Sequence, residues 1–150
     1  MTVSTDSVLA YRADESLVDR VKRHEGFRST MYRCSAGRWT VGYGFNLEAL
    51  SMPVEVAELW LSMLLDRCSA QLDTLQLHSL ASEPNRRNVL VEMIYQLGFA
   101  RFLRFSKLLQ AVRQGSWAFA ALEMMDSKWA RQCPSRAREL SHVMRTGSWS

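Results

Sequence analysis

The chain has 150 residues, a formal net charge of +4 at pH 7, 47% apolar residues and 23% charged residues. This composition is typical of one globular domain or of two small lobes, and it excludes disordered, collagen-like and coiled-coil chains. No apolar run reaches the roughly 20 residues that a membrane span needs, so we do not expect an integral membrane protein.

The N-terminus and the cysteines bear on where the chain is made. Residues 1–16 lack the basic start and apolar stretch of a secretory signal, so we expect a flexible tail and synthesis in the cytoplasm without a signal peptide. Cys34, Cys68 and Cys133 are widely spaced and form neither a disulfide framework nor a zinc pattern. We therefore expect a reducing compartment at synthesis, and we interpret Cys68 and Cys133 as structural.

The first organised stretch predicts a helix followed by a β-hairpin. Ser16 suits a helix N-cap, and Gly26 is a natural stop for that helix. Residues 28–45 contain β-favouring side chains on both sides of Ser35-Ala36-Gly37, which predicts a hairpin with its turn there. Gly42 and Gly44 alternate with bulky residues, which indicates backbone that passes close to another group.

From Pro53 onward the apolar residues recur at helical spacing. Pro53, Pro84 and Pro134 suit first turns, and glycines at 98 and 115 suit helix ends. The predicted helices carry apolar stripes, namely Ala57, Trp60, Leu61, Leu64 and Leu65, then Val89, Leu90, Met93, Ile94 and Leu97, then Phe105, Leu108, Leu109 and Val112, then residues 117–125, then Leu140, Val143 and Met144.

These elements predict an α+β fold that is mostly α. We expect a small β-hairpin lobe at about 28–52, a linking helix at about 53–80 and a helical lobe at about 84–149. A cleft between a small lobe and a larger one is the expected place for a ligand.

Glu25, Cys34 and Thr40 form the spacing most suggestive of chemistry. Eight residues separate Glu25 from Cys34, and five separate Cys34 from Thr40, so a turn followed by a hairpin can bring the three side chains to one wall. Cleavage of a glycosidic bond needs a protonated acid on the leaving oxygen and a second group on the other face of the sugar. An activated thiol can act as nucleophile or base, and a threonine hydroxyl can hold water. Apolar neighbours favour a protonated glutamate, and we expect them to be Met31, Tyr32 and Trp39.

Each of these residues also has a plain structural interpretation. A glutamate at a helix end is usually a solvated charge, and a single cysteine is usually a small buried side chain. Threonine is common in strands for its β propensity alone. Only the joint spacing is therefore informative.

The motif His24-Glu25-Gly26, followed by Cys34 and Thr40 at these spacings, resembles the catalytic signature of the bacteriophage-type lysozymes, glycoside hydrolase family 24. Residues 41–47, Val-Gly-Tyr-Gly-Phe-Asn-Leu, resemble the family's glycine-rich second strand. Further similarity lies in Arg86-Arg87, Met93 to Gly98, Ser127-Lys128-Trp129, Pro134 to Ala137 and Arg145 to Trp149. The resemblance covers roughly residues 17–149.

The resemblance implies a role for each matching residue. Glu25 matches the general acid, Thr40 matches a threonine that positions water or sugar, and Arg136 matches an arginine that pairs with the catalytic glutamate. Gly44, Asn46, Tyr95 and Gln96 match positions that face the glycan. Cys34 stands where the best-known members have aspartate, so the chain is expected to be a variant with a thiol at that position. The segment between Thr40 and Arg86 is short compared with longer members, which indicates a trimmed small lobe.

The resemblance implies hydrolysis of the β-1,4 bond between N-acetylmuramic acid and N-acetylglucosamine in peptidoglycan, leading to lysis of the bacterial wall. It implies no metal and no other cofactor, a monomer, and action on the wall in the periplasm after release or delivery. The alternative is a non-catalytic peptidoglycan-binding protein on the same scaffold, in which Cys34 marks lost chemistry.

Charge is concentrated in residues 101–150, which hold nine basic and three acidic residues. Such a surface suits an anionic cell envelope or the carboxylates of peptidoglycan, and it also permits nucleic acid electrostatically. No helix-turn-helix or zinc spacing is present, so we do not expect a nucleic-acid partner. Basic amphipathic helices leave membrane disruption open as a side activity.

Overall fold

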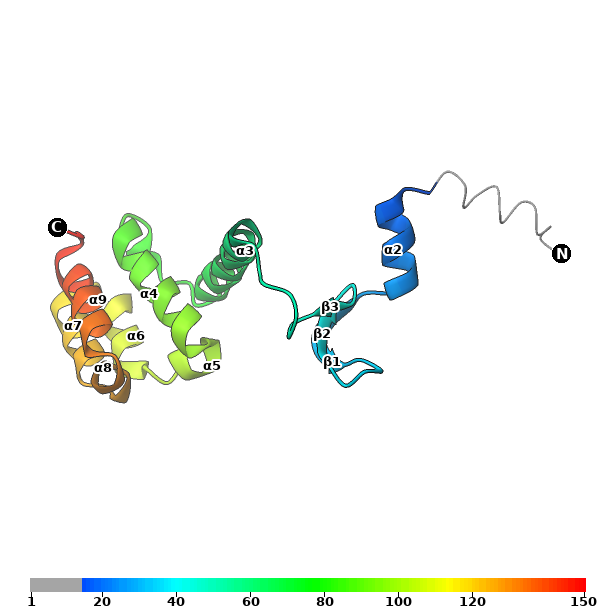
Figure 1. Ribbon diagram of the computed structural model, residues 1–150. Coiled ribbons are helices and arrows are strands. Elements are labelled where there is room, and N and C mark those ends of the chain that lie inside the picture. The colour runs from blue at the N-terminus through cyan, green and yellow to red at the C-terminus, as the bar shows by residue number, and fades with distance from the viewer. Residues whose placement is uncertain (1–14) are drawn as a thin grey trace. The chain divides into compact units, whose positions relative to one another are not determined.

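The computed structural model describes residues 15–150 and divides them into two compact units (Figure 1). The first unit ends at Pro53, and the second comprises Val54–Ser150. The tail that we expect at residues 1–16 lies outside the described part, apart from its last two residues. Each unit is described by itself below.

The first unit contains one helix and a small sheet. Helix α2 (Leu17–Glu25) begins after Ser16, whose side chain accepts a hydrogen bond from the backbone N–H of Asp19 at 3.1 Å. It ends at Gly26, whose φ of 69° turns the chain toward the sheet. The predicted N-cap and stop of this helix are both confirmed.

The sheet has three antiparallel strands in sequence order: β1 (Arg28–Arg33), β2 (Trp39–Gly42) and β3 (Phe45–Asn46). Tyr32 and Asn46 are the β1 and β3 partners of Thr40, and a register irregularity interrupts the β1–β2 pairing. The Gly37 N–H donates to the Cys34 carbonyl at 2.8 Å, which closes the predicted hairpin turn. The sequence thus predicts this hairpin correctly.

The second unit is helical. Its elements are α3 (Val54–Asp73), the 3-10 turn η1 (His78–Leu80), α4 (Pro84–Leu97), α5 (Phe99–Phe102), α6 (Ser106–Arg113), α7 (Trp117–Met125), α8 (Lys128–Gln132) and α9 (Pro134–Thr146). Pro84 and Pro134 begin their helices as predicted, whereas Pro53 immediately precedes the first residue of α3. Together with the small sheet, these helices confirm the mostly α, lysozyme-like α+β class.

The core of the second unit forms around α4, which contacts α3, α5 and α9. Its largest fully buried side chains include Phe102, Leu90, Met93, Ile94 and Leu140. Each such side chain contributes about 1.5–3 kcal/mol by leaving water. The predicted stripes on α4, α6 and α9 supply most of the largest fully buried side chains, so periodicity identifies the centre of this core well.

Helix α3 departs from its predicted stripe. Trp60 and Leu61 are exposed in the structure, and the buried residues of this helix are Cys68 and Leu72, about two and three turns beyond Leu61. The helical period predicts which face of α3 is apolar. Which turns of that face become buried depends on where α3 packs against α4. Buried Cys68 agrees with its structural interpretation. No helix in residues 15–150 is long and apolar enough to cross a membrane.

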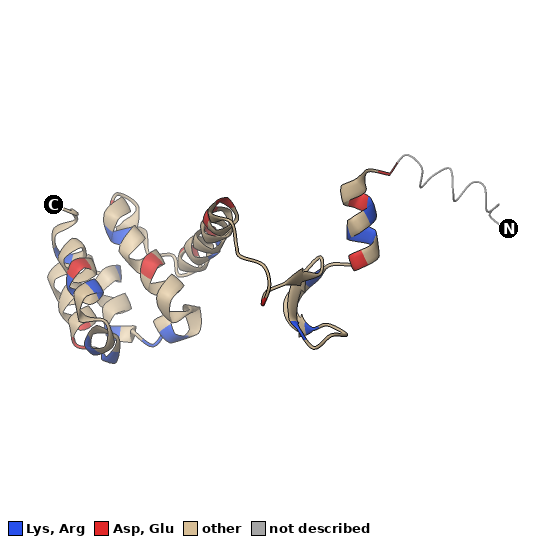
Figure 2. Cartoon of the chain, viewed as in Figure 1, with Lys and Arg blue, Asp and Glu red and all other residues tan. Residues whose placement is uncertain are grey.

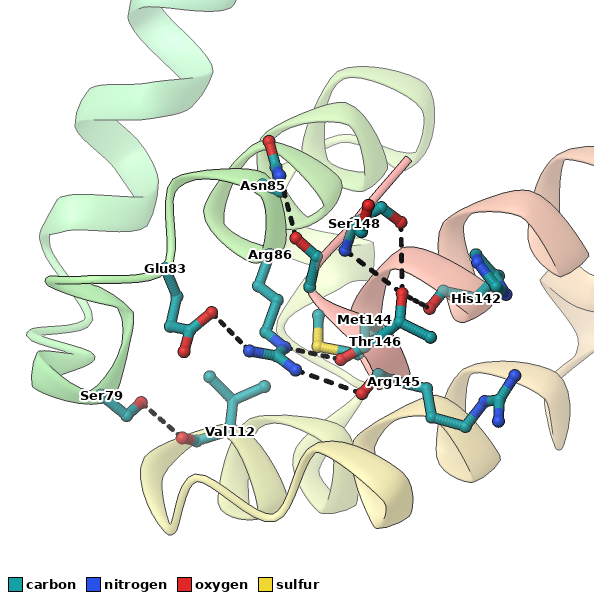
Figure 3. A network of polar contacts seen from close by, with 11 residues as sticks. Ser79, Glu83, Asn85, Arg86, Val112, His142, Met144, Arg145, Thr146 and Ser148 are labelled. Atoms are coloured by element: carbon teal, nitrogen blue, oxygen red, sulfur yellow. Dashed lines mark hydrogen bonds and ion pairs between the residues drawn. The ribbon is translucent and has the colours of Figure 1, made fainter. Parts of the chain in front are cut away.

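Arg86 ties the start of α4 to the end of α9 (Figure 3). Its Nε donates to the Met144 carbonyl at 2.8 Å, its Nη2 donates to the Arg145 carbonyl at 3.1 Å, and its Nη1 pairs with Glu83. The guanidinium carbon lies 4.5 Å from the centre of the Trp117 ring. Only 8% of Arg86 is exposed, so this buried cation is satisfied by carbonyls that a helix C-terminus otherwise leaves unpaired.

Candidate functional site

Glu25 is the last residue of α2, and its carboxylate lies against Gly44 in the turn between β2 and β3. A methyl group on Gly44 would lie 2.5 Å from Oε2 of Glu25 and 3.1 Å from its Cδ. Gly44 also has a φ of 77°, where side chains are disfavoured. The turn therefore approaches the carboxylate closely, as the glycine alternation predicted for this backbone.

Cys34 and Thr40 lie together on the first hairpin. Cys34 follows β1, and its backbone N–H donates to the Arg38 carbonyl at 3.0 Å. Thr40 lies in β2 with only 3% of its surface exposed, and its hydroxyl donates to the same carbonyl at 3.0 Å. The predicted proximity of the thiol and the hydroxyl is thus present in the structure.

The Cys34 thiol lies in a set of hydrogen-bond donors. The backbone N–H groups of Arg38 and Ala36 lower its pKa below the usual thiol range, the Thr40 side chain adds to this, and partial burial opposes it. Because the Thr40 hydroxyl has one proton, it can donate either to the Arg38 carbonyl or to the sulfur, but not to both at once. Cys34 is therefore disposed to carry negative charge at lower pH than an ordinary thiol.

Tyr32 and Trp39, two of the residues expected to surround Glu25, each lie against an arginine of the sheet. The Arg28 guanidinium lies 4.5 Å from the centre of the Tyr32 ring, and that of Arg33 lies 4.0 Å from the centre of the Trp39 ring. Met31 is exposed. The sequence could not reveal this, because cation–π pairs within a sheet depend on which face each side chain occupies.

A second aromatic group surrounds the glycine-rich turn. The Tyr43 ring centre lies 5.3 Å from that of Phe27 and 6.4 Å from that of Phe45. A methyl group on Gly42 would lie 2.8 Å from two ring carbons of Phe45, so this glycine also permits a close contact. Asn46 accepts a hydrogen bond from the Glu48 N–H at 3.0 Å through its Oδ1. These contacts fix the shape of the turn that lies against Glu25.

In the second unit, Tyr95 and Gln96 are neighbours near the end of α4. Tyr95 is exposed, while Gln96 is held by α8 and by the start of α9. Its Oε1 accepts from the Trp129 indole N–H at 2.9 Å, and its Nε2 donates to Cys133 Sγ at 3.5 Å. Cys133 in turn donates to the Trp129 carbonyl at 3.0 Å. Cys133 thus has the structural role expected of it, and it helps to orient the Gln96 amide.

Arg136 lies in the first turns of α9 and pairs with Glu92 of α4. Its Nε and its Nη2 each lie 2.7 Å from Oε1 of Glu92. Both side chains are more than a third exposed, so solvent screens the pair. The sequence did not suggest Glu92, because one glutamate on a helix carries no distinctive signal. The expected pairing of Arg136 with Glu25 stays a prediction.

A pocket of about 670 Å³ lies beside Trp129 among α5, α6, α7 and α8. Its charged lining consists of Arg101, Arg104, Lys107, Lys128, Glu123 and Asp126. The Phe105 ring, which meets the Trp129 ring edge-on at 6.5 Å, forms an apolar part of the lining. The sequence indicates the excess of basic residues but not this pocket, because its cations come from three different helices and from the turn between α5 and α6.

Comparison with known proteins places these features in a family. The model of the phage lysozyme family matches residues 22–142. The chain is 25% identical to probable T4-type lysozyme 2 of Dictyostelium discoideum, over 89% of this chain and 95% of that protein. It is 32% identical to an endolysin of Acyrthosiphon pisum secondary endosymbiont phage 1, over 74% of this chain and 75% of that protein. The chain belongs to the phage lysozyme family.

Proposed function

We propose that this chain hydrolyses the β-1,4 bond between N-acetylmuramic acid and N-acetylglucosamine in peptidoglycan, and so lyses bacterial walls. Water is added across the bond: the leaving oxygen gains a proton and the anomeric carbon gains a hydroxyl group. We also propose that the chain acts as a monomer on the wall in the periplasm.

Glu25 is the proposed general acid, which protonates the leaving oxygen. Cys34 and Thr40 act on the other side of the sugar, the first as a thiolate and the second as the hydroxyl that holds water. Cys34 takes the position of an aspartate in the best-known members, and the lowered pKa of its thiol supports this exchange because it favours the negatively charged form. Gly44 and Asn46 line the substrate side of the small unit.

The observation that supports this proposal best is the contact between Glu25 and Gly44. Glu25 is exposed to solvent, but its carboxylate lies against a turn whose glycine leaves room for nothing larger. The Cys34–Thr40 pair lies on the adjoining strands of the same small unit. Glycoside hydrolysis needs an acid and a second group on the other face of the sugar, and we assign these roles to the carboxyl group and the thiol of this small unit.

The second unit supplies the proposed binding residues Tyr95, Gln96 and Arg136. An exposed tyrosine ring and an oriented amide suit a sugar, which offers an apolar face and hydroxyl groups. The pocket beside Trp129 contains four cations and two carboxylates. This mixed lining complements the peptides of peptidoglycan, which carry carboxylate and amino groups.

The test is Glu25→Gln, which keeps the size of the side chain and removes its titratable proton. We expect the release of reducing ends from purified peptidoglycan to fall by at least about a hundredfold, the contribution typical of general acid catalysis. The matched control is Glu58→Gln, an exposed glutamate on α3 that should leave the rate unchanged.

Two outcomes would contradict the proposal. If Glu25→Gln releases reducing ends as fast as the parent, Glu25 is not the acid. If the parent binds peptidoglycan in a pull-down but releases no reducing ends, the chain is a non-catalytic binding protein instead. A thermal melt of each variant shows whether its fold is intact.

A further inference from the structure

Helix α7 presents an apolar face to solvent. Phe119 is 68% exposed, Leu122 is 64% exposed and Met125 is 36% exposed, and these residues recur every three positions. The opposite face contains Ala120, Ala121 and Met124, which are buried in the core. Apart from Glu123, helix α7 is therefore apolar, although only one face is covered within the described structure.

Such a face is unusual on a soluble surface. Single exposed apolar residues are common, but neighbouring large ones on one helix face mark an interaction site. Nothing in the proposed hydrolysis uses Phe119, Leu122 or Met125. Their exposure therefore needs a separate explanation.

Basic residues border this face on the side of α9. The Ser141 hydroxyl of α9 donates to the Ala121 carbonyl of α7 at 3.1 Å. The face of α9 that carries Ser141 therefore lies beside α7. Arg138 and Arg145 stand three residues before and four residues after Ser141, so they share that row, and both are exposed.

The other edge of the face is bordered by Glu123, which also lines the pocket described above. The lining of that pocket as a whole contains four basic residues and two acidic ones. Figure 2 shows blue Lys and Arg segments spread over the helices of the second unit. Residues 101–150 together carry nine basic and three acidic residues, a net charge of +6.

We propose that the exposed face of α7 docks on an anionic phospholipid bilayer. Phe119 and Leu122 insert at the boundary between headgroups and acyl chains, and Arg138 and Arg145 contact headgroup phosphates. Apolar residues bordered by cations are the pattern of helices that lie in a membrane interface. A second copy of the chain fits less well, because self-pairing would bring two positively charged borders together.

This inference does not depend on the proposed hydrolysis, and vesicles without glycan test it. The full chain is sedimented with vesicles of phosphatidylglycerol and phosphatidylethanolamine, and separately with vesicles of phosphatidylcholine. We expect binding to the anionic vesicles only, weakened by salt. Phe119→Ser with Leu122→Ser should weaken it by about tenfold or more, and Arg138→Gln with Arg145→Gln by a similar factor.

The matched control is Leu59→Ser with Met63→Ser on α3, where the two side chains are 65% and 62% exposed. This pair should bind anionic vesicles like the parent. Both serine pairs should keep the parent's rate of reducing-end release, and thermal melts check that both fold.

Three results would overturn the proposal. The first is that the parent does not bind anionic vesicles or binds phosphatidylcholine equally well. The second is that the α7 pair binds like the parent or that the α3 pair loses binding equally. The third is sedimentation equilibrium that shows a dimer of the parent and a monomer of the α7 pair, which would assign the face to a second copy.

Discussion

Gly44 lies directly against the carboxylate of Glu25, at a point where a methyl group would be 2.5 Å from Oε2. The contact joins the end of α2 to the turn between β2 and β3. The position of the proposed acid therefore depends on Gly44. The turn needs a glycine here for two reasons: the backbone has a positive φ, and a side chain would collide with the Glu25 carboxylate.

Gly44→Ala tests this contact. The methyl group should displace the Glu25 carboxylate, so we expect reducing-end release to fall at least about tenfold, as misplacement of a catalytic group does. The positive φ should also cost about 1–2 kcal/mol of unfolding free energy. Urea denaturation measures the second effect and a peptidoglycan assay measures the first.

Gly37→Ala is the matched control for that substitution. Gly37 has a φ of 74°, close to that of Gly44, but a methyl group there would meet nothing within 4 Å. It should lose similar stability and keep most of its activity. If the two alanine variants lose activity equally, strain rather than contact with Glu25 is responsible.

The pKa of Cys34 predicts its reactivity. Because the N–H groups of Arg38 and Ala36 lower this pKa, Cys34 should be alkylated by iodoacetamide at lower pH than Cys68, whose pKa is raised by burial. Mass spectrometry of peptides after timed alkylation at several pH values measures this. Equal modification of both cysteines at every pH would contradict it.

The same lowered pKa predicts how stability varies with pH. A depressed folded-state pKa means that the Cys34 thiolate stabilises the fold above the unfolded pKa, and that this stability is lost as pH falls through the folded pKa. Cys34→Ser should therefore flatten the pH dependence of unfolding between the folded-state and unfolded-state pKa values of this thiol. The same residue can be tested by its effect on peptidoglycan hydrolysis. Cys34→Asp keeps a charged group and should retain this activity, whereas Cys34→Ala removes the thiolate and should lower it.

The pair of Arg136 and Glu92 should contribute little to stability. Both side chains are more than a third exposed, so a double-mutant cycle with Arg136→Gln and Glu92→Gln should give a coupling below about 1 kcal/mol. Arg136→Gln should nevertheless lower peptidoglycan hydrolysis clearly, since the arginine is a proposed substrate-binding residue. A large coupling energy with unchanged activity would assign a structural role to Arg136.

Arg86 should contribute much more than its neighbour Arg87. Arg86→Lys removes the planar group that reaches two carbonyls of α9 and lies over Trp117, so we expect a loss of about 2–4 kcal/mol in unfolding free energy. Arg87→Lys is the control, since Arg87 pairs at its more exposed position with Asp73 and Ser69 of α3, and it should cost less than about 1 kcal/mol. Similar losses of unfolding free energy in both variants would mean that the buried contacts of Arg86 stabilise the fold no more than the exposed contacts of Arg87.

Much of the local structure could be read from the sequence. The prolines at 84 and 134 begin helices, Gly26 ends one, and Ser35-Ala36-Gly37 forms the hairpin turn. These features depend on φ preferences and on spacing between near neighbours, which the order of residues fixes directly. The resemblance to the phage-type lysozymes was visible for the same reason, since the motif from Glu25 to Thr40 is a local spacing.

Only the tertiary structure decided which distant side chains meet. Gln96 is held by Trp129 and Cys133, Arg136 pairs with Glu92, and cations from three helices and one turn line one pocket. The short helix α5 and the covered turns of α3 likewise follow from packing against α4. Contacts between residues more than 30 positions apart depend on which helices pack against each other. The spacing of residues along the chain predicts the apolar face of each helix but not the helix that will cover it.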